Sequence, residues 1–264
     1  GAFRVVGPDG APVLHQVGGS GELLFEAQAV PPLGYAVYHI VKGAADVADA
    51  ARLKVSERGL ENECLRVRFD RSGCLSSVFD KVENREVLAT GQRGNDIQLF
   101  DDRPHGNEAW DIDHNFEDAM WRPGPATFEV VEEGPLRIAV RVTRRTEKSV
   151  IAQDVRLTAH GTRLDFATRV DWHETRVLMK AAFPVDVRAS NATYETPFGA
   201  IERATHHNTA WDRARYEVPA HRWADLSEGD YGVSLLNDCK YGYDTEGHVL
   251  RLSLLRSPID PDPK

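Results

Sequence analysis

The sequence has few cysteines, no long apolar run and no excess of positive charge. Its 264 residues hold only Cys64, Cys74 and Cys239, an odd and sparse set that does not form a disulfide framework, so we expect a reducing, cytoplasmic compartment. No apolar run reaches the roughly 18 residues of a membrane span, and no signal-peptide pattern is present, so no membrane partner is expected. The net charge of -9 argues against a nucleic-acid partner, which favours a basic face.

Short motifs that reveal common enzymes are also missing. The sequence has no GxSxG elbow, P-loop, HExxH or CxxC pattern. His206 and His207 are adjacent, and neighbouring residues of a strand point to opposite faces, so we expect no metal site there. Asp111 and Asp113 would share a face in an extended segment. Such a pair can catalyse glycoside hydrolysis, but it can also bind calcium, cap a loop or hold an arginine.

Alternation of apolar and polar residues is the main structural signal, and it predicts an all-β fold. Residues 65–70 alternate as a half-buried strand does, and 74–81 follow after the turn Arg71–Ser72–Gly73, so the two segments predict a hairpin. Five further strands at regular spacing between 126 and 186 are typical of a β-sandwich. More strands are predicted at 96–100 and 249–255.

Composition divides the chain into two parts. Strands predicted at 23–30 and 35–41 are separated by a Pro-Pro-Leu-Gly break, which indicates a small β-unit. The stretch 44–53 fits either a short helix or a linker. We therefore predict a small β-unit with linker at 1–53 and a large β-domain at 54–264.

Two polar, aromatic segments suit carbohydrate. The stretch from Tyr194 to Tyr243 contains Trp211 and Trp223 among arginine, aspartate, asparagine and histidine residues. Aromatic faces stack on sugars and the polar groups bond to hydroxyls, but the same groups could also satisfy one another within a β-sheet. Residues 101–124 form a long polar loop, and long ordered loops are usually functional or packed over another element.

Three long motifs in this order closely resemble glycoside hydrolase family 38, in its cytosolic and bacterial α-mannosidase branch. They are ENECLRVRFDRSGCLSSVFDKVENREVL, NDIQLFDDRPHGNEAWDID, and the run from ETPFGAIERATHHNTAWD to LLNDCKYGY, with LSLLRSPIDPDP after it. The resemblance covers nearly the whole chain. It implies a large antiparallel supersandwich, like that of galactose mutarotase, preceded by the small β-unit.

Only the C-terminal β-region of that family is represented. The resemblance implies a retaining hydrolase of terminal α-D-mannosides, whose nucleophile and zinc ligands lie in an N-terminal catalytic domain that precedes this segment. We therefore expect no catalytic residue and no metal in this chain, and an isolated chain that is inactive. The sequence stops soon after the SPxxPDP motif, so the β-domain is expected to lack its last strands. Expected partners are the mannoside, the catalytic and helical domains of the same protein, and a second copy of the chain.

The resemblance also implies substrate contacts, all of them side chains that can stack on a sugar or bond to its hydroxyls: Arg203, Trp110, Asp102, Asp111, Asn237 and Asp238. Arg203 in GAIERATH looks like the arginine that the family's β-region contributes to the active site. Each residue also has a structural interpretation. Arg203 could pair with a carboxylate, Trp110 could pack against another domain, and Asn237 with Asp238 could form a turn.

Two other functions are compatible with the residues. An autonomous carbohydrate-binding module would need a preformed groove. A mutarotase-like enzyme would need a histidine and a glutamate on the concave face of a sheet, and no such pair can be assigned in the sequence.

Overall fold

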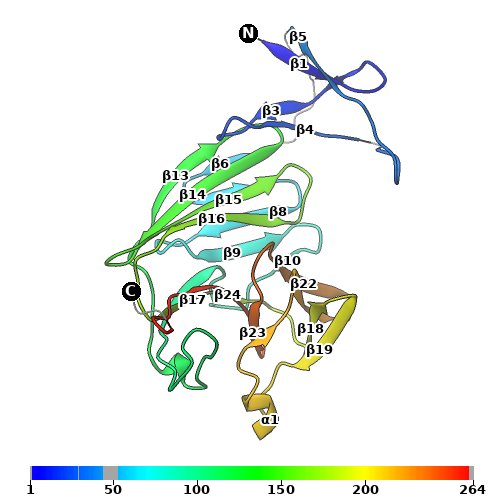
Figure 1. The fold of residues 1–264 in the computed structure, drawn as a ribbon. Helices are drawn as coiled ribbons and strands as arrows, with labels where there is room; N and C mark the ends of the chain where they lie inside the picture. The colour runs from blue at the N-terminus through cyan, green and yellow to red at the C-terminus, as the bar shows by residue number, and fades with distance from the viewer. Residues whose placement is uncertain (1, 29, 44–52, 262–264) are drawn as a thin grey trace.

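The computed structural model describes residues 2–28, 30–43 and 53–261, and it confirms the all-β prediction. The described strands form six sheets, in which every pairing is antiparallel (Figure 1). Beside them lie one short helix, α1 (Ala210–Arg213), and one 3-10 turn, η1 (Phe116–Asp118). No helix among the described residues is long and apolar enough to cross a membrane. Most of the predicted linker, 44–52, lies outside the described residues.

Two small sheets come from the first 42 residues. One has the order β2-β1-β5 and the other pairs β3 with β4. The bounds are β1 (Phe3–Val6), β2 (Pro12–Val13), β3 (His15–Val17), β4 (Leu23–Phe25) and β5 (His39–Lys42). The strands predicted at 23–30 and 35–41 are therefore shorter than expected. The reason is that β4 has only the three residues of β3 to pair with, and the chain beyond it has no ladder partner.

A two-layer sandwich follows. Its first sheet has the order β10-β9-β8-β7-β6 and its second the order β13-β14-β15-β16. The bounds are β6 (Lys54–Ser56), β7 (Gly59–Glu61), β8 (Leu65–Phe69), β9 (Leu75–Asp80), β10 (Arg85–Glu86), β13 (Thr127–Glu132), β14 (Arg137–Arg145), β15 (Val150–Thr158) and β16 (Leu164–Asp171).

The hairpin predicted at 65–81 is confirmed as β8 and β9. Leu65, Val67 and Phe69 are buried and pack in one core with residues of β14 such as Val142. Gly73 turns the hairpin with φ at +83°, and a Cβ there would lie 2.5 Å from Val142 Cγ1. Only glycine fits this turn, because both the backbone conformation and the close approach exclude a side chain.

Two further sheets complete the fold. They have the orders β12-β11-β17-β24-β23-β20 and β19-β18-β21-β22. The bounds are β11 (Asp96–Asp101), β12 (Met120–Trp121), β17 (Val177–Pro184), β18 (Asn191–Thr196), β19 (Gly199–Ala204), β20 (Val218–Pro219), β21 (Trp223–Glu228), β22 (Tyr231–Leu236), β23 (Gly242–Glu246) and β24 (Val249–Arg256).

The sequence predicted five consecutive strands between 126 and 186, but the fifth, β17, belongs to a different sheet from the other four. The four strands β13 to β16 form one sheet, whereas β17 pairs with β11 and β24 in another. Seven of its eight residues are buried. A strand with both faces covered belongs at the centre of a sheet, and β17 takes that place between its two neighbours.

The irregular segments gather at one end of the molecule. The loop after β11 and helix α1 both extend from the end opposite the N-terminal sheets (Figure 1). Phe116 of the loop is buried against Phe100 and Leu178, with Tyr216 packed beside them. The predicted long polar loop is therefore anchored by its own aromatic residue, next to the segment that carries α1.

Candidate functional site

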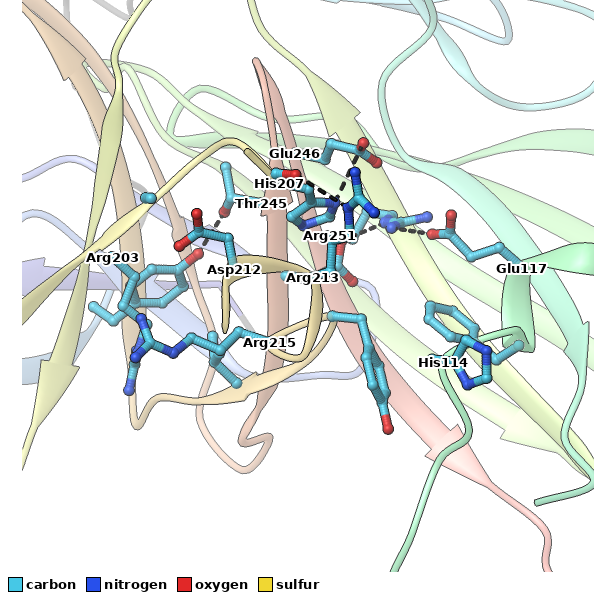
Figure 2. A pocket seen from close by; sticks show the side chains of 16 residues that line it. His114, Glu117, Arg203, His207, Asp212, Arg213, Arg215, Thr245, Glu246 and Arg251 are labelled. Atoms are coloured by element: carbon cyan, nitrogen blue, oxygen red, sulfur yellow. Dashed lines mark hydrogen bonds and ion pairs between the residues drawn. The ribbon is translucent and has the colours of Figure 1, made fainter. Parts of the chain in front are cut away.

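A pocket of about 290 Å³ lies at this end of the molecule (Figure 2). Its walls come from the loop after β11, from β18 and β19, from the segment around α1, and from β23 and β24. The lining residues are His114, Phe116, Glu117, Tyr194, Arg203, Ala204, His207, Asp212, Arg213, Arg215, Tyr216, Val218, Asp244, Thr245, Glu246 and Arg251. Four arginines and four carboxylates thus face one cavity.

A charged network underlies the pocket. Lys180 is fully buried, and its Nζ lies 2.6 Å from Glu217 Oε2 and 2.7 Å from Asp244 Oδ2. Arg251 Nε contacts the other oxygen of Asp244 at 2.5 Å, and its Nη2 pairs with Glu117. The network links β17, β23, β24 and the loop. Its three carboxylates outnumber its two cations, so each cation has two carboxylate partners and neither is available to a ligand.

Arg203 has a different environment. Its guanidinium carbon lies 4.8 Å from the centroid of the Tyr194 ring, a cation–π contact, and the side chain is half-buried. Its Nη1 is enclosed, and no acceptor among the described residues reaches it. The pKa of Arg203 is lowered, because burial disfavours the charge and Arg215 repels it. A donor that is already positioned and has no acceptor is suited to an oxygen atom of a ligand.

Helix α1 positions the next two arginines. Thr209 Oγ1 accepts a hydrogen bond from Asp212 N at 3.1 Å, and Asp212 Oδ2 accepts one from Thr209 N at 3.1 Å, which makes a capping box. The hydrogen bonds from Thr209 hold the pKa of Asp212 below its usual value. Arg213 ends the helix and Arg215 follows, so the capped turn presents both arginines to the pocket.

The three loop residues that the sequence selected do not line this pocket. Asp102 is 2% exposed and is held by Arg256, whose Nε donates to Oδ2 at 2.7 Å. Arg256 Nη2 also donates to the backbone oxygen of Asp111 at 2.5 Å. Trp110 projects into solvent, with 71% of its surface exposed. In the structure, Asp102 therefore shapes the loop, whereas the side chains of Trp110 and Asp111 are exposed.

Asn237 and Asp238 lie outside the pocket as well. Asn237 Oδ1 accepts hydrogen bonds from Cys239 N at 2.9 Å and Lys240 N at 2.5 Å, while its Nδ2 donates to His221 O at 2.9 Å. This is the turn that the sequence offered as the alternative. Asp238 is exposed beside it. Of the six predicted contacts, Arg203 is the one that lines the pocket.

No metal cluster is found in the part of the chain that the structure describes, where no three His, Cys, Asp or Glu residues are grouped to hold an ion. His206 and His207 lie in a turn after β19 and contact separate carboxylates, Asp212 at 3.7 Å and Glu246 at 3.6 Å. The zinc that the family resemblance implies does not fit these residues.

Sequence reasoning missed most of the pocket. Arg213 and Arg215 form an Arg-Ala-Arg pair next to Trp211, a local basic signal that could have been noticed. His114, Glu117 and Arg251 carried no comparable signal, because they are far from Arg203 in the chain and only the fold brings them together.

Comparison with known proteins agrees with the resemblance. Residues 60–264 match the family described as "Glycosyl hydrolases family 38 C-terminal domain". The chain is 46% identical over 206 residues to alpha-mannosidase 2C1 of Mus musculus, and 37% identical over 206 residues to an alpha-mannosidase of Saccharomyces cerevisiae. These matches cover 77% and 73% of this chain but only 20% and 19% of the relatives. The chain thus spans about a fifth of the length of these relatives.

Solved structures show the same fold. An alpha-mannosidase from Enterococcus faecalis V583 superposes with a TM-score of 0.76 over 97% of this chain and 34% of its own, at 12% identity. A second structure, of a family 38 protein from Enterococcus faecalis, has a TM-score of 0.74 at 12% identity. With the family match over most of its length, the chain belongs to glycosyl hydrolase family 38, as its C-terminal domain.

Proposed function

We propose that this chain is the β-region of a retaining α-mannosidase, and that it completes the sugar site of a catalytic domain encoded earlier in a longer protein. The relatives are named α-mannosidases, and the chain corresponds to about 20% of their length. Retaining hydrolysis needs a nucleophilic carboxylate and an acid/base carboxyl group. We assign both, together with the zinc, to the remainder of that protein, and we expect this chain alone to be inactive. The three free cysteines support a cytoplasmic location.

Arg203 carries the proposal. Its enclosed Nη1 has no acceptor among the described residues, and a hydroxyl of a mannoside is an acceptor of suitable size and polarity. Tyr194 holds the guanidinium from one side, and the Tyr194 hydroxyl donates to Thr245 Oγ1 at 2.8 Å. The role of this chain is thus to bind and orient the sugar. Residues 1–53 form, in this proposal, a separate unit that precedes the sugar-binding domain.

The test uses the full-length protein that contains this chain. Arg203→Ala should lower kcat/KM for an aryl α-mannoside by about 10- to 100-fold, because a hydrogen bond to a charged group contributes roughly 1.5–3 kcal/mol. The matched control is Arg68→Ala, which removes an exposed arginine of β8, in a different sheet from Arg203. An unchanged rate in a folded Arg203→Ala protein would mean that the β-region only supports chemistry done elsewhere.

One observation favours the second candidate, an autonomous carbohydrate-binding module. Trp211 and Trp110 are 79% and 71% exposed, on the two segments whose residues Asp212 and His114 line the pocket. Exposed indole faces are suited to stack on sugars. Calorimetric titration of this chain with mannose and mannobiose separates the two functions. A half-site should give no measurable binding at millimolar sugar, whereas a module should bind at micromolar concentrations.

A further inference from the structure

We propose that Arg203, Arg213 and Arg215 form a binding site for a phosphate monoester on a small ligand such as a sugar phosphate. All three arginines line the pocket, and they come from β19 and from the capped turn of α1 (Figure 2). The inference does not depend on the proposed mannosidase function. It concerns the charge that this pocket selects.

The carboxylates of the pocket already have partners, but these three arginines have no carboxylate partner. Glu117 and Asp244 pair with Arg251, while Asp212 is engaged by Thr209 and Glu246 lies 3.6 Å from His207. Within the described ranges, by contrast, no carboxylate comes within ion-pair distance of the three arginines. The hydrogen bond of Arg213 is from Nε to the backbone oxygen of His207, at 3.4 Å. None of the three arginines is therefore neutralised by a direct ion pair, although Asp212 lies close enough for the charge of Arg215 to lower its pKa.

Two of these arginines repel each other. Arg203 and Arg215 lie on the same side of the pocket in Figure 2, opposite Glu117 and Arg251. Burial lowers the pKa of Arg203, and the neighbouring charge of Arg215 lowers it further. Like charges that face one cavity repel each other, and an anion bound between them offsets that repulsion. The enclosed Nη1 of Arg203, which has no acceptor among the described residues, is available to donate to the same anion.

The chemistry favours phosphate. A guanidinium binds oxyanions through paired N–H donors, and a phosphate monoester offers three oxygens with a charge of about -1.5 to -2 at neutral pH. A neutral hydroxyl could satisfy Nη1, but it would give none of the three arginines an ion pair. The cavity of about 290 Å³ is near the lower end of small-ligand pockets, so it has room for a monosaccharide beside the phosphate.

The experiment titrates inorganic phosphate, mannose 6-phosphate and mannose into the full-length protein by calorimetry, with ionic strength held constant by NaCl. We expect both phosphates to bind, and Arg203→Ala and Arg215→Ala each to weaken that binding at least tenfold. Arg215 is exposed, so its loss should not disturb folding. Arg68→Ala is again the control and should bind phosphate as the wild type does.

Two results would overturn the inference. One is phosphate affinity that is the same in wild type, Arg203→Ala and Arg215→Ala, which would place any bound phosphate elsewhere in the protein. The other is binding of mannose at least as tight as that of mannose 6-phosphate, which would make the pocket selective for a neutral sugar. In the second case Arg203→Ala would still be expected to lower mannoside hydrolysis, so failure of this inference is distinguishable from failure of the proposed function.

Discussion

Arg256 donates two hydrogen bonds to Asp102, from Nε to Oδ2 at 2.7 Å and from Nη2 to Oδ1 at 3.0 Å. Asp102 is 2% exposed, and Arg256 also donates to the backbone oxygens of Glu108 and Asp111. A single arginine at the end of β24 therefore holds the start and the middle of the loop that carries Trp110. The conformation of this loop depends on a pair of residues that are 154 positions apart in the sequence.

Arg256→Ala should destabilise the fold strongly. Removing one partner of a buried ion pair leaves an unpaired charge, and the typical cost is about 3–5 kcal/mol. Urea unfolding of the wild type and the variant measures this difference. Arg103→Ala is the control, since its pair with Asp101 is exposed at 60% and 40% and should contribute less than about 1 kcal/mol. Equal effects of the two substitutions would contradict the central role of Arg256.

Lys180→Met should cost a similar amount, about 3–5 kcal/mol, because Glu217 and Asp244 would lose their shared buried cation. The double variant with Asp244→Asn should be less destabilised than the sum of the two single changes. A double-mutant cycle from urea unfolding tests this coupling. Simple additivity would show that Lys180 acts through packing rather than through its charge.

Asp96 should give the stability of the protein a specific acid dependence. Burial is the largest single influence on Asp96 and raises its pKa. Hydrogen bonds from Arg122, with Nε to Oδ1 at 2.8 Å and Nη2 to Oδ2 at 2.7 Å, the charge of Arg122 and a hydrogen bond from Gln98 together outweigh burial and lower the pKa. A pKa that is lower in the folded state adds stability above the unfolded pKa of about 3.9, and that stability is lost as the pH falls through the folded pKa.

Arg122→Gln should remove this contribution. The stability difference between wild type and Arg122→Gln is therefore expected to be full at about pH 5 and to shrink as the pH falls below about 4. Urea unfolding at several pH values gives the difference curve. A difference that stays constant down to pH 3 would show that Asp96 is not tuned by Arg122.

Phe198→Gly should stabilise the isolated domain. Phe198 sits at the tip of the β18–β19 hairpin with φ at +63°, and its side chain is fully exposed. A left-handed conformation costs a non-glycine residue about 1 kcal/mol or more, and no packing in the described residues offsets it. Thermal unfolding of the variant should show a higher Tm, and a lower Tm would mean that the ring makes stabilising contacts after all.

Much of the local structure could be predicted from the sequence. The alternation of residues 65–69 predicts β8, and Gly73 predicts the turn that follows, because side-chain direction and φ are properties of neighbouring residues. The motif around Arg203 predicted one residue of the pocket and the family. Conversely, the pairing of β17 with β24 was not predicted, because the alternation of apolar and polar residues does not say which strand lies beside it.

The sequence by itself determined most of the strands and turns and the family, and it singled out Arg203 as a candidate. Only the tertiary structure decided that Asp102 is held by Arg256, 154 positions away, and that Arg203 shares a cavity with Arg215 and Glu117. The reason is physical. Strand and turn formation follow from the conformational preferences of adjacent residues, whereas the partner of a polar group depends on sheet order and register, which are set by burial across the whole domain.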